Sequence, residues 1–348
     1  MEATESVNDD AIFMHRALQL AALGLGNVSP NPMVGCVIVH ENKIIGEGYH
    51  QIYGQSHAEV NAIQSVENQK ILPSATLYVN LEPCSHWGKT PPCADLIIEK
   101  KIKKVVVSNL DPNPKVAGKG IEKLRIAGIE VELGLLENEG NRLNRRFFTF
   151  QTKQRPYIIL KWAETADGFI AKENFDSKWI SNQYSRLLVH KWRSEEDAVL
   201  VGFNTAWHDN PQLNVRDVAG RNPVRIVIDA ELGLPVTHHL FDYSQNTIII
   251  NRHKSSEGNL TNYMKSDLKT LNGGLNSLYE SGIQSVIVEG GSKTLQRFID
   301  ENLWDETRIF TSPISFESGI KAPQKRGKLL KSEEIIGNIL ETYTNTWK

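Results

Sequence analysis

The stretch SHAEVNAIQSV (residues 56–66) is followed by EPCSHWGKTPPC (residues 82–93), and together they place one His, one Glu and two Cys in a suggestive order. The first stretch predicts a helix with His57 in its first turn. Glu59, two residues later, then points away from His57, so the two are not expected to bind one metal as helical i, i+4 ligands would. This spacing suits a site in which His57 binds the metal and Glu59 lies beside the metal-bound water.

The two cysteines complete the predicted metal site. Cys84 lies just past a predicted strand, and Cys93 opens a predicted helix, where the helix dipole favours thiolate over thiol. One His and two thiolates leave the fourth tetrahedral position of zinc to water, whose pKa the ion lowers. The sequence therefore predicts one zinc ion per chain, bound by His57, Cys84 and Cys93, with Glu59 as the catalytic proton shuttle. The plain alternative is a helix cap, a solvated Glu and two cysteines that share a loop by chance.

The number of ligands bears on the role of this zinc. Structural zinc sites usually close with four protein ligands, whereas His57, Cys84 and Cys93 make three. The remaining cysteine, Cys36, lies in the apolar stretch GCVIV and is expected to be a buried small hydrophobic residue. We therefore expect a catalytic site.

Length and composition limit the class of protein. With 348 residues the chain is expected to form two domains, each with its own core. A formal net charge of −2 gives no general attraction to nucleic acid or membrane surfaces, and no run of about eighteen apolar residues predicts a membrane span. The N-terminal MEATESVNDD is acidic and polar, unlike a secretory signal. Three cysteines in so long a chain indicate a reducing cytoplasm and no disulfide framework.

Strands and helices alternate along both halves, which predicts an α/β architecture. A polar and basic connector, QTKQRP, precedes a new apolar strand, so we expect one domain over residues 1–150 and a second over residues 151–348. In the first half we expect a hairpin around Glu41 and Asn42, strands within 75–84 and 104–114, helices at 11–26, 57–66 and 91–102, and a helix, turn and strand over 120–136. In the second half we expect strands at 157–163, 197–207, 224–232, 246–251 and 285–291, and helices at 182–194 and 292–303.

Six motifs make the chain resemble a known family, the bifunctional deaminase/reductases of riboflavin biosynthesis. In family order they are SPNPMVGCVIV, GEGYH, HAEVNAI, EPCSHWGKTPPC, DPNPKVAGKG and VEGG. The eight residues between Cys84 and Cys93 depart from the C-x-x-C of deaminases at large, but they are typical of this branch. The resemblance covers nearly the whole chain.

The resemblance implies two consecutive reactions on one small molecule, a pyrimidine ribosyl phosphate. The first domain would be a cytidine-deaminase-like α/β/α layered domain that hydrolytically deaminates 2,5-diamino-6-ribosylamino-4(3H)-pyrimidinone 5′-phosphate. The second would be a dihydrofolate-reductase-like α/β domain that reduces the ribosyl group to ribityl with NADPH. A homo-oligomer is also implied.

Two residues near the zinc motifs are candidates for binding this substrate. Asn31 lies in PNP, where related deaminases bring an amide to the pyrimidine edge, and an Asn pairs naturally with donor and acceptor groups there. Alternatively, Asn31 is a turn residue between two prolines. Lys89, in the zinc loop, would either meet the substrate phosphate or be solvated.

The second half lacks the G-x-G-x-x-G fingerprint of a Rossmann dinucleotide site. Instead, SVIVEGGSKTLQRF predicts a strand, Glu289, two glycines and a helix start, whose free N–H groups can bind phosphate. Alone, such a turn is structural more often than not. In the family it binds the cofactor pyrophosphate, and Glu289 faces the substrate. The implied cofactor ligands are Gly291, Ser292, Lys293, Thr294, Leu295, Gln296 and Arg297.

Further reductase residues follow from the resemblance. Lys161, an inward-pointing Lys on an apolar strand, is expected to be catalytic, either stabilising charge on the opening sugar oxygen or holding the substrate. The implied substrate ligands are Ser177, Arg193, Leu213 and Arg216, of which the two arginines fit a phosphate clamp unless they are ordinary surface residues. The implied cofactor ligands are Ala163, Trp179, Thr205 and Asp209. His208 stands where the family commonly has an acidic residue.

Two other hypotheses stay open at this point. One is a zinc-dependent deaminase of nucleic-acid bases, as in tRNA editing, which would need a basic face for the backbone. The near-neutral net charge and the second domain disfavour it. The other is that one half of the chain has lost its activity.

Overall fold

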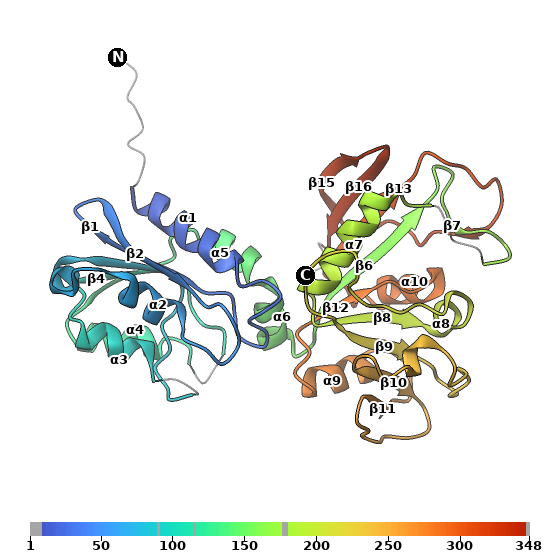
Figure 1. Ribbon diagram of the computed structural model, residues 1–348, viewed down its shortest axis with the longest axis horizontal. Coiled ribbons are helices and arrows are strands. Elements are labelled where there is room, and N and C mark those ends of the chain that lie inside the picture. The colour runs from blue at the N-terminus through green and yellow to red at the C-terminus, as the bar shows by residue number, and fades with distance from the viewer. Residues whose placement is uncertain (1–8, 89–90, 114–115, 176–179, 346–348) are drawn as a thin grey trace, which may run out of the picture. The chain divides into compact units, whose positions relative to one another are not determined.

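The computed structural model describes residues 9–88, 91–113, 116–175 and 180–345. The chain divides into two compact units, Met1–Lys153 and Gln154–Lys348, which Figure 1 shows with their elements labelled. None of the helices in the described part of the chain is long and apolar enough to cross a membrane. Both units are of the mixed α/β class.

The first unit is built on a five-stranded mixed sheet with the strand order β2-β1-β3-β4-β5. β1 pairs antiparallel with β2 and β3, whereas β3, β4 and β5 run parallel. The strands are β1 (Gly35–His40), β2 (Lys43–Tyr49), β3 (Thr76–Leu81), β4 (Lys104–Asn109) and β5 (Glu130–Leu133). The expected hairpin is present: Glu41 and Asn42 both have positive φ angles, 49° and 58°, as a two-residue turn between twisted strands requires.

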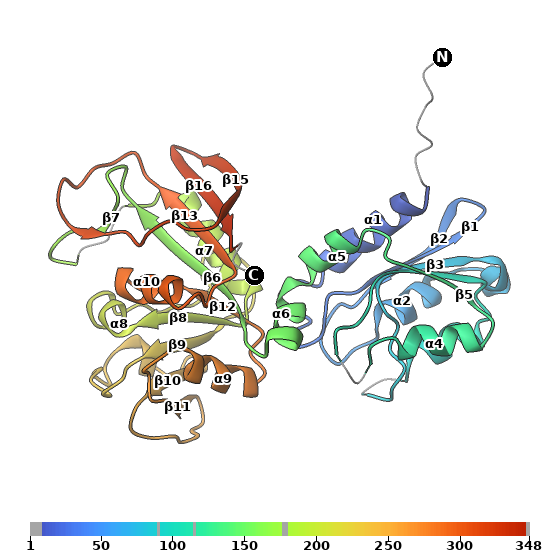
Figure 2. The ribbon, with the colours of Figure 1, turned by 180° about the vertical axis from the view of Figure 1, so that it is seen from behind.

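Helices cover both faces of this sheet, so the unit is an α/β/α sandwich (Figure 2). Because successive strand residues point to opposite faces, Cys36 and Leu77 pack with α2, α3 and α4, whereas Val37 and Tyr78 pack with α1. Cys36 is fully buried, which confirms its expected role as a core residue. The helices are α1 (Asp9–Ala22), α2 (Ala58–Ser65), α3 (Cys93–Glu99), α4 (Lys119–Ile126), α5 (Glu137–Leu143) and α6 (Arg145–Lys153), with a 3-10 helix at Gln69–Ser74.

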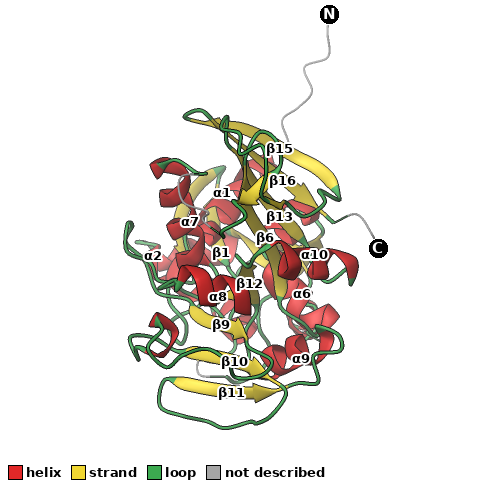
Figure 3. Ribbon diagram, turned by 90° about the vertical axis from the view of Figure 1, so that its right-hand side faces the viewer, coloured by secondary structure: helices red, strands yellow, loops and turns green. Residues whose placement is uncertain are grey.

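The second unit is built on a nine-stranded sheet with the order β11-β10-β9-β8-β12-β6-β13-β16-β15. All neighbours from β11 to β13 are parallel, and β16 and β15 add an antiparallel edge. Figure 3 shows β9, β10 and β11 side by side. The strands are β6 (Tyr157–Glu164), β8 (Ala198–Gly202), β9 (Val224–Ile228), β10 (Thr247–Asn251), β11 (Thr261–Lys265), β12 (Ser285–Val288), β13 (Glu306–Thr311), β15 (Lys328–Ile335) and β16 (Asn338–Thr344), with β7 (Phe169–Ala171) and β14 (Ile320–Lys321) as a separate pair.

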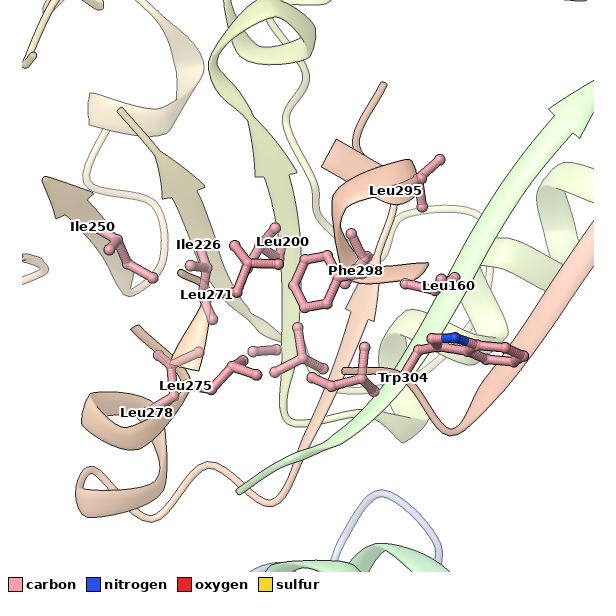
Figure 4. Close-up of a cluster of buried hydrophobic side chains, with 14 of the residues drawn as sticks. Leu160, Leu200, Ile226, Ile250, Leu271, Leu275, Leu278, Leu295, Phe298 and Trp304 are labelled. Atoms are coloured by element: carbon pink, nitrogen blue, oxygen red, sulfur yellow. The ribbon is translucent and has the colours of Figure 1, made fainter. Parts of the chain in front are cut away.

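Two helices pack on each face of the large sheet. On one face, Leu275 of α9 and Phe298 of α10 meet strand residues such as Leu200, as Figure 4 shows. On the other face lie α7 and α8. The helices are α7 (Gln183–Glu195), α8 (Phe203–Asp209), α9 (Asn272–Glu280) and α10 (Ser292–Asp300), with a 3-10 helix at His239–Phe241. Because the central strands are parallel, their carboxyl ends, and the residues that follow them, gather at one edge.

Three expectations about the elements need correction. The single strand expected over 197–207 is wrong after Gly202, because this residue ends β8 and caps α8. The first helix ends at Ala22, short of the expected glycines. The first three residues of the supposed connector, 151–153, belong to α6. These residues are polar because they form the last turn of this amphipathic helix.

Candidate functional site

The structure brings His57, Cys84 and Cys93 together in the first unit. His57 is the N-cap of α2, Cys84 lies in the loop after β3, and Cys93 is the first residue of α3. His57 Nδ1 lies 3.6 Å from Cys84 Sγ and 3.3 Å from Cys93 Sγ. Zinc bonds of about 2.0–2.1 Å to nitrogen and 2.3 Å to sulfur, at tetrahedral angles, separate such ligand atoms by about 3.6 Å. The donor set and its spacing therefore fit a zinc ion with one position left open.

These three groups share protons at short range. Contact with the Cys93 thiol lowers the pKa of Cys84, and the same contact together with burial raises the pKa of Cys93. Contact with Cys84 also raises the pKa of His57. The Cys93 backbone N–H donates to Cys84 Sγ at 3.3 Å, which further favours a thiolate there. A divalent cation held by His57, Cys84 and Cys93 would take the place of these protons and neutralise both sulfurs.

Glu59, the second residue of α2, lies beside this group and is buried, with 3% of its surface exposed. Burial, together with the negative charge of Cys84, raises the pKa of Glu59 to about 7. Its Oε2 atom is buried and has no hydrogen-bond partner among the described residues. A buried carboxylate oxygen is costly to leave unpaired, so its position indicates a partner supplied from outside the chain, such as a water on the metal. With a pKa near neutrality, this carboxyl group can both take up and release a proton.

Asn31 lies in the loop that leads from α1 to β1 and contacts a histidine that sequence reasoning missed. Asn31 Nδ2 lies 3.1 Å from His50 Nε2, and His50 follows directly after β2. Burial lowers the pKa of His50. The only signal for His50 in the sequence was its place at the end of the GEGYH motif. Lys89 falls outside the described residues.

Glu82 is a second residue that sequence reasoning missed, although it stands two positions before Cys84. Its carboxylate is buried and accepts four backbone N–H groups: Oε1 from Gly120 at 2.8 Å and Ile121 at 3.3 Å, and Oε2 from Gly118 at 2.9 Å and Asp111 at 3.3 Å. Glu82 therefore caps the N-terminus of α4. It holds the loop after β4 against the loop that carries Cys84.

In the second unit, a cleft of about 990 Å³ opens at the edge where the parallel strands end. Residues from β6, α7, α8 and the turn before α10 line it. Among the expected reductase residues, the lining includes Lys161, Ala163, Arg193, Thr205, Asp209, Leu213, Arg216, Glu289, Gly291, Ser292, Lys293, Thr294 and Arg297. Residues that lie far apart in the sequence thus meet in one cavity.

Glu289 is the charged centre of this cleft. Arg193 donates to both of its oxygens, Nε to Oε1 at 2.7 Å and Nη2 to Oε2 at 3.0 Å, and Lys161 Nζ lies 3.5 Å from Oε2. Burial alone would raise the pKa of Glu289, but the charges of Arg193 and Lys161 outweigh it and lower the value to about 2. Burial lowers the pKa of Lys161, and Glu289 opposes this effect. Arg193 is therefore engaged by Glu289 here, while Arg216 is exposed and bonds Asn214 Oδ1.

The turn before α10 packs closely against the end of β8. The Gly291 N–H donates to Thr205 Oγ1 at 2.8 Å, and a Cβ at Gly202 would lie 2.1 Å from Thr294 Oγ1. A side chain at Gly202 would therefore push these elements apart. The first N–H groups of a helix have no acceptor within it, so the start of α10 presents donors to the cleft.

Two of the expected reductase residues, Leu295 and Gln296, are described but do not line the cleft. Leu295 is fully buried in the hydrophobic core, and its N–H already donates to the Gly291 carbonyl. Gln296 faces away and accepts from the Gln324 N–H. Ser177 and Trp179 fall outside the described residues.

Other residues of the cleft lining were not predicted from the sequence, among them His190 and Phe175. His190 of α7 contacts the Asn214 carbonyl through Nδ1 at 3.0 Å and Asp217 through Nε2 at 3.1 Å. Burial, with Arg193 and Arg216 nearby, lowers its pKa. Phe175 stacks on His208 with ring centroids 4.0 Å apart. His208, in place of the acidic residue common in the family, thus packs against an aromatic ring.

Comparison with known proteins places both units. Residues 7–109 match the family model for the cytidine and deoxycytidylate deaminase zinc-binding region, and residues 156–327 match the RibD C-terminal domain. The riboflavin biosynthesis protein RibD of Aquifex aeolicus is 44% identical to this chain, with 89% of each covered. RibD of Actinobacillus pleuropneumoniae is 39% identical over 94% of this chain and 93% of its own length.

Solved structures agree with these relatives. A Thermotoga maritima diaminohydroxyphosphoribosylaminopyrimidine deaminase/5-amino-6-(5-phosphoribosylamino)uracil reductase is 41% identical, with a TM-score of 0.88, and covers 97% of this chain and 99% of its own. Acinetobacter baumannii RibD is 34% identical, with a TM-score of 0.90 and the same coverage. The similarity therefore extends over both units.

Proposed function

The chain belongs to the RibD family of bifunctional deaminase/reductases of riboflavin biosynthesis, and we propose that residues 1–150 form its deaminase domain and residues 151–348 its reductase domain. Membership confirms the resemblance expected from the six sequence motifs. It also decides against the nucleic-acid deaminase, because the relatives cover both halves of the chain. The two compact units, which meet between Lys153 and Gln154, support the proposed division.

The proposed substrate is the one named for a relative of known structure. The Thermotoga maritima protein is named as a deaminase of diaminohydroxyphosphoribosylaminopyrimidine and a reductase of 5-amino-6-(5-phosphoribosylamino)uracil. For this chain, the first reaction replaces the 2-amino group of the pyrimidine by an oxygen from water and releases ammonia. The second reduces the ribosyl group of that product to ribityl, with NADPH as the reductant.

The deaminase step is assigned to the His57, Cys84, Cys93 and Glu59 group. Zinc, when bound by the first three residues, supplies a nucleophile by lowering the pKa of a water. Glu59 would carry the two protons of that water in turn, the first to the ring nitrogen and the second to the amino group that leaves as ammonia. The observation that carries this assignment is the buried, unpartnered Oε2 of Glu59 beside three groups spaced for zinc. Asn31 binds the pyrimidine edge, and Lys89 is assigned to the substrate phosphate.

The reductase step is assigned to the cleft of the second unit. Lys161 donates to the sugar oxygen that gains charge as the ring opens, and Glu289 orients both Lys161 and the substrate. Arg216, Leu213 and Ser177 bind the substrate, and Arg193 does so while it holds Glu289 in place. The support for these roles is that Lys161 and Arg193 each lie within 3.5 Å of the Glu289 carboxylate in one cleft.

The cofactor is assigned to the same cleft. NADPH supplies the hydride, and its phosphates bind at the N-terminus of α10, where helix N–H groups point outward. The lining residues assigned to it are Ala163, Thr205, Asp209, Gly291, Ser292, Lys293, Thr294 and Arg297. Trp179 is added from the family resemblance. Leu295 and Gln296 contribute only by forming the first turns of α10, since the Leu295 N–H bonds the Gly291 carbonyl and both side chains lie elsewhere.

Location and assembly complete the proposal. A cytoplasmic location is supported by three free cysteines, two of which belong to the zinc group. A homo-oligomer is proposed from the family resemblance, and analytical ultracentrifugation of the purified protein tests it. A single species at the mass of one chain, 39.1 kDa, would refute it.

The experiment that tests the function follows ammonia release and NADPH oxidation in one assay. Wild-type protein fed the diaminopyrimidine ribosyl phosphate should release ammonia and oxidise NADPH. A Glu59→Ala variant should oxidise NADPH only when it is given the deaminated compound. Release of ammonia without NADPH oxidation would refute the reductase assignment, and inactivity of zinc-loaded protein on both compounds would refute the substrate.

A further inference from the structure

We propose that His50 is a positioning residue of the deaminase, which fixes the side-chain amide of Asn31 with its carbonyl oxygen turned to the substrate. The inference rests on the proposed deaminase function and concerns how the pyrimidine edge is recognised. His50 contacts neither the metal group through a hydrogen bond nor, on this account, the reacting atoms.

The partners of the His50 ring determine which of its nitrogens carries hydrogen. His50 is buried, with 2% of its surface exposed, and Nδ1 lies 3.0 Å from the Ser56 carbonyl oxygen. A carbonyl oxygen can only accept a hydrogen bond, so Nδ1 must carry the hydrogen. A neutral imidazole carries one such hydrogen, and Nε2 is then an acceptor. Among the described residues the two ring nitrogens face the Ser56 carbonyl and the Asn31 amide, and no carboxylate bonds either nitrogen.

The acceptor at Nε2 sets the orientation of Asn31. Only the Nδ2 side of the Asn31 amide can donate to Nε2, at the observed distance of 3.1 Å. Oδ1 then points away from the ring. Within the described part of the chain Oδ1 has no hydrogen-bond partner, and Asn31 is only partly buried. The amide therefore presents a free acceptor, with one further N–H beside it.

The backbone that carries Asn31 is held independently of His50. Asn144 Oδ1 accepts the Met33 N–H at 2.8 Å, and Asn144 Nδ2 donates to the Met33 carbonyl at 2.8 Å. Asn80 Nδ2 donates to the same carbonyl at 3.0 Å. These contacts fix the loop two residues from Asn31 but do not touch its side chain. The choice between the two amide orientations is therefore left to His50.

This cluster adjoins the proposed zinc site. Ser56, which fixes the His50 tautomer, directly precedes His57, and the rings of His50 and His57 meet edge to face with centroids 5.4 Å apart. A carbonyl oxygen at this place selects a ring edge that offers N–H or NH2 donors, as an amino-pyrimidinone does. The reversed amide would turn its NH2 group outward and select an acceptor edge. A site built to accept such hydrogen bonds discriminates strongly against analogues that lack the donor.

Two substitutions test the contacts of the two His50 nitrogens one at a time. The amide of Gln reaches the position of Nε2, so His50→Gln can still accept from Asn31. The amide of Asn reaches only the position of Nδ1, so His50→Asn keeps the Ser56 contact and loses Asn31. We expect kcat/KM for deamination to fall about tenfold or more in His50→Asn and to stay within about threefold of wild type in His50→Gln. His40→Asn, the same change at the end of β1, is the matched control, and zinc content is measured for each variant.

Nitrogen-15 NMR of histidine-labelled wild-type protein gives a readout that does not depend on activity. The His50 signal, assigned by its loss in His50→Gln, should show a neutral ring with hydrogen on Nδ1. Hydrogen on Nε2 would require the reversed Asn31 amide and would overturn the inference. The inference would also fail if kcat/KM fell equally in the two variants, or fell in neither. If wild type does not deaminate the compound at all, the proposed function fails, while the NMR result still decides the role of His50.

Discussion

Arg193 and Glu289 form a bidentate ion pair inside the cleft of the second unit, with N···O distances of 2.7 and 3.0 Å. Their side chains are only 11% and 8% exposed. Arg193 comes from α7, on one face of the sheet, and Glu289 from the turn between β12 and α10, at its edge. Removing one member of a buried pair leaves the other charge without compensation, which costs far more than the loss of a surface pair.

This pair predicts how the stability of the second unit depends on pH. The folded pKa of Glu289, about 2, lies below its ordinary value of 4.5. Its contribution to stability is therefore fully present above about pH 4.5 and is lost as the pH falls towards 2. We expect Glu289→Gln to lower the free energy of unfolding at pH 7 by about 3 kcal/mol and the two proteins to converge at acid pH. Urea unfolding at several pH values measures this.

The matched control is Glu231→Gln, which breaks the exposed pairs of Glu231 with Arg252 and His253 in the same unit. Exposed pairs contribute little, so this variant should unfold almost as wild type does at every pH. If the two variants lost equal stability, or if the Glu289 effect persisted at pH 2, the buried pair would not be the cause.

We predict that substitution of Lys161 lowers the reductase activity but not the deaminase activity. Lys161→Met removes the charge beside Glu289 and the donor assigned to the sugar oxygen, while keeping a side chain of similar length. NADPH oxidation with the deaminated compound should fall by about a hundredfold, and ammonia release from the diaminopyrimidine should not change. Lys265→Met, on the exposed end of β11, is the control. A folded Lys161→Met protein that oxidised NADPH at the wild-type rate would exclude the catalytic role.

We predict that substitution of Glu59 lowers the rate of deamination but leaves zinc bound. Glu59→Gln keeps the size of the buried side chain but cannot take up the proton of the attacking water, so ammonia release should fall by about a thousandfold. Zinc content should remain near one per chain, because His57, Cys84 and Cys93 are unchanged. Glu67→Gln, at an exposed position just beyond α2, should behave as wild type. Loss of zinc in Glu59→Gln alone would show that the carboxylate serves the metal and not the proton transfer.

The zinc group could be predicted from sequence because its signals are local. His57 and Cys93 each start a helix with clear apolar periodicity, and Cys84 follows a buried strand. The alternation of strands and helices was equally clear for β3, β4 and β5 and for β6, β8, β9, β10 and β12, but the parallel strands β11 and β13 and the helix α9 were not predicted. It failed where burial does not alternate: β15 is exposed along most of its length, and its sequence, KLLKSEEI, has no period of two.

The supporting residues could not be predicted because their roles depend on contacts distant in the chain. Glu82 accepts N–H groups 29 to 39 residues away, and Asn144 reaches Met33 across 111 residues. The phosphate clamp of Arg193 and Arg216 was expected from the family resemblance and from residue type. The structure shows that Arg193 is also paired with Glu289, since a buried guanidinium requires a fixed counter-charge.

Glu82 gives the last prediction, on how the loop after β4 is held. Each of its two oxygens accepts two backbone N–H groups, at the N-terminus of α4 and at Asp111. Glu82→Gln replaces one oxygen by an NH2 group that faces donors, so two N–H groups lose their acceptor. We expect a loss of about 2–3 kcal/mol in the stability of the first unit and a weaker deaminase, because Cys84 lies two residues away. Calorimetry and ammonia release measure both effects. Glu122→Gln, a change at an exposed residue in the first turn of the same helix, should leave stability and ammonia release unchanged. An equal loss of stability in the two variants would mean that the net charge near α4, and not the capping of its N–H groups, sets the stability.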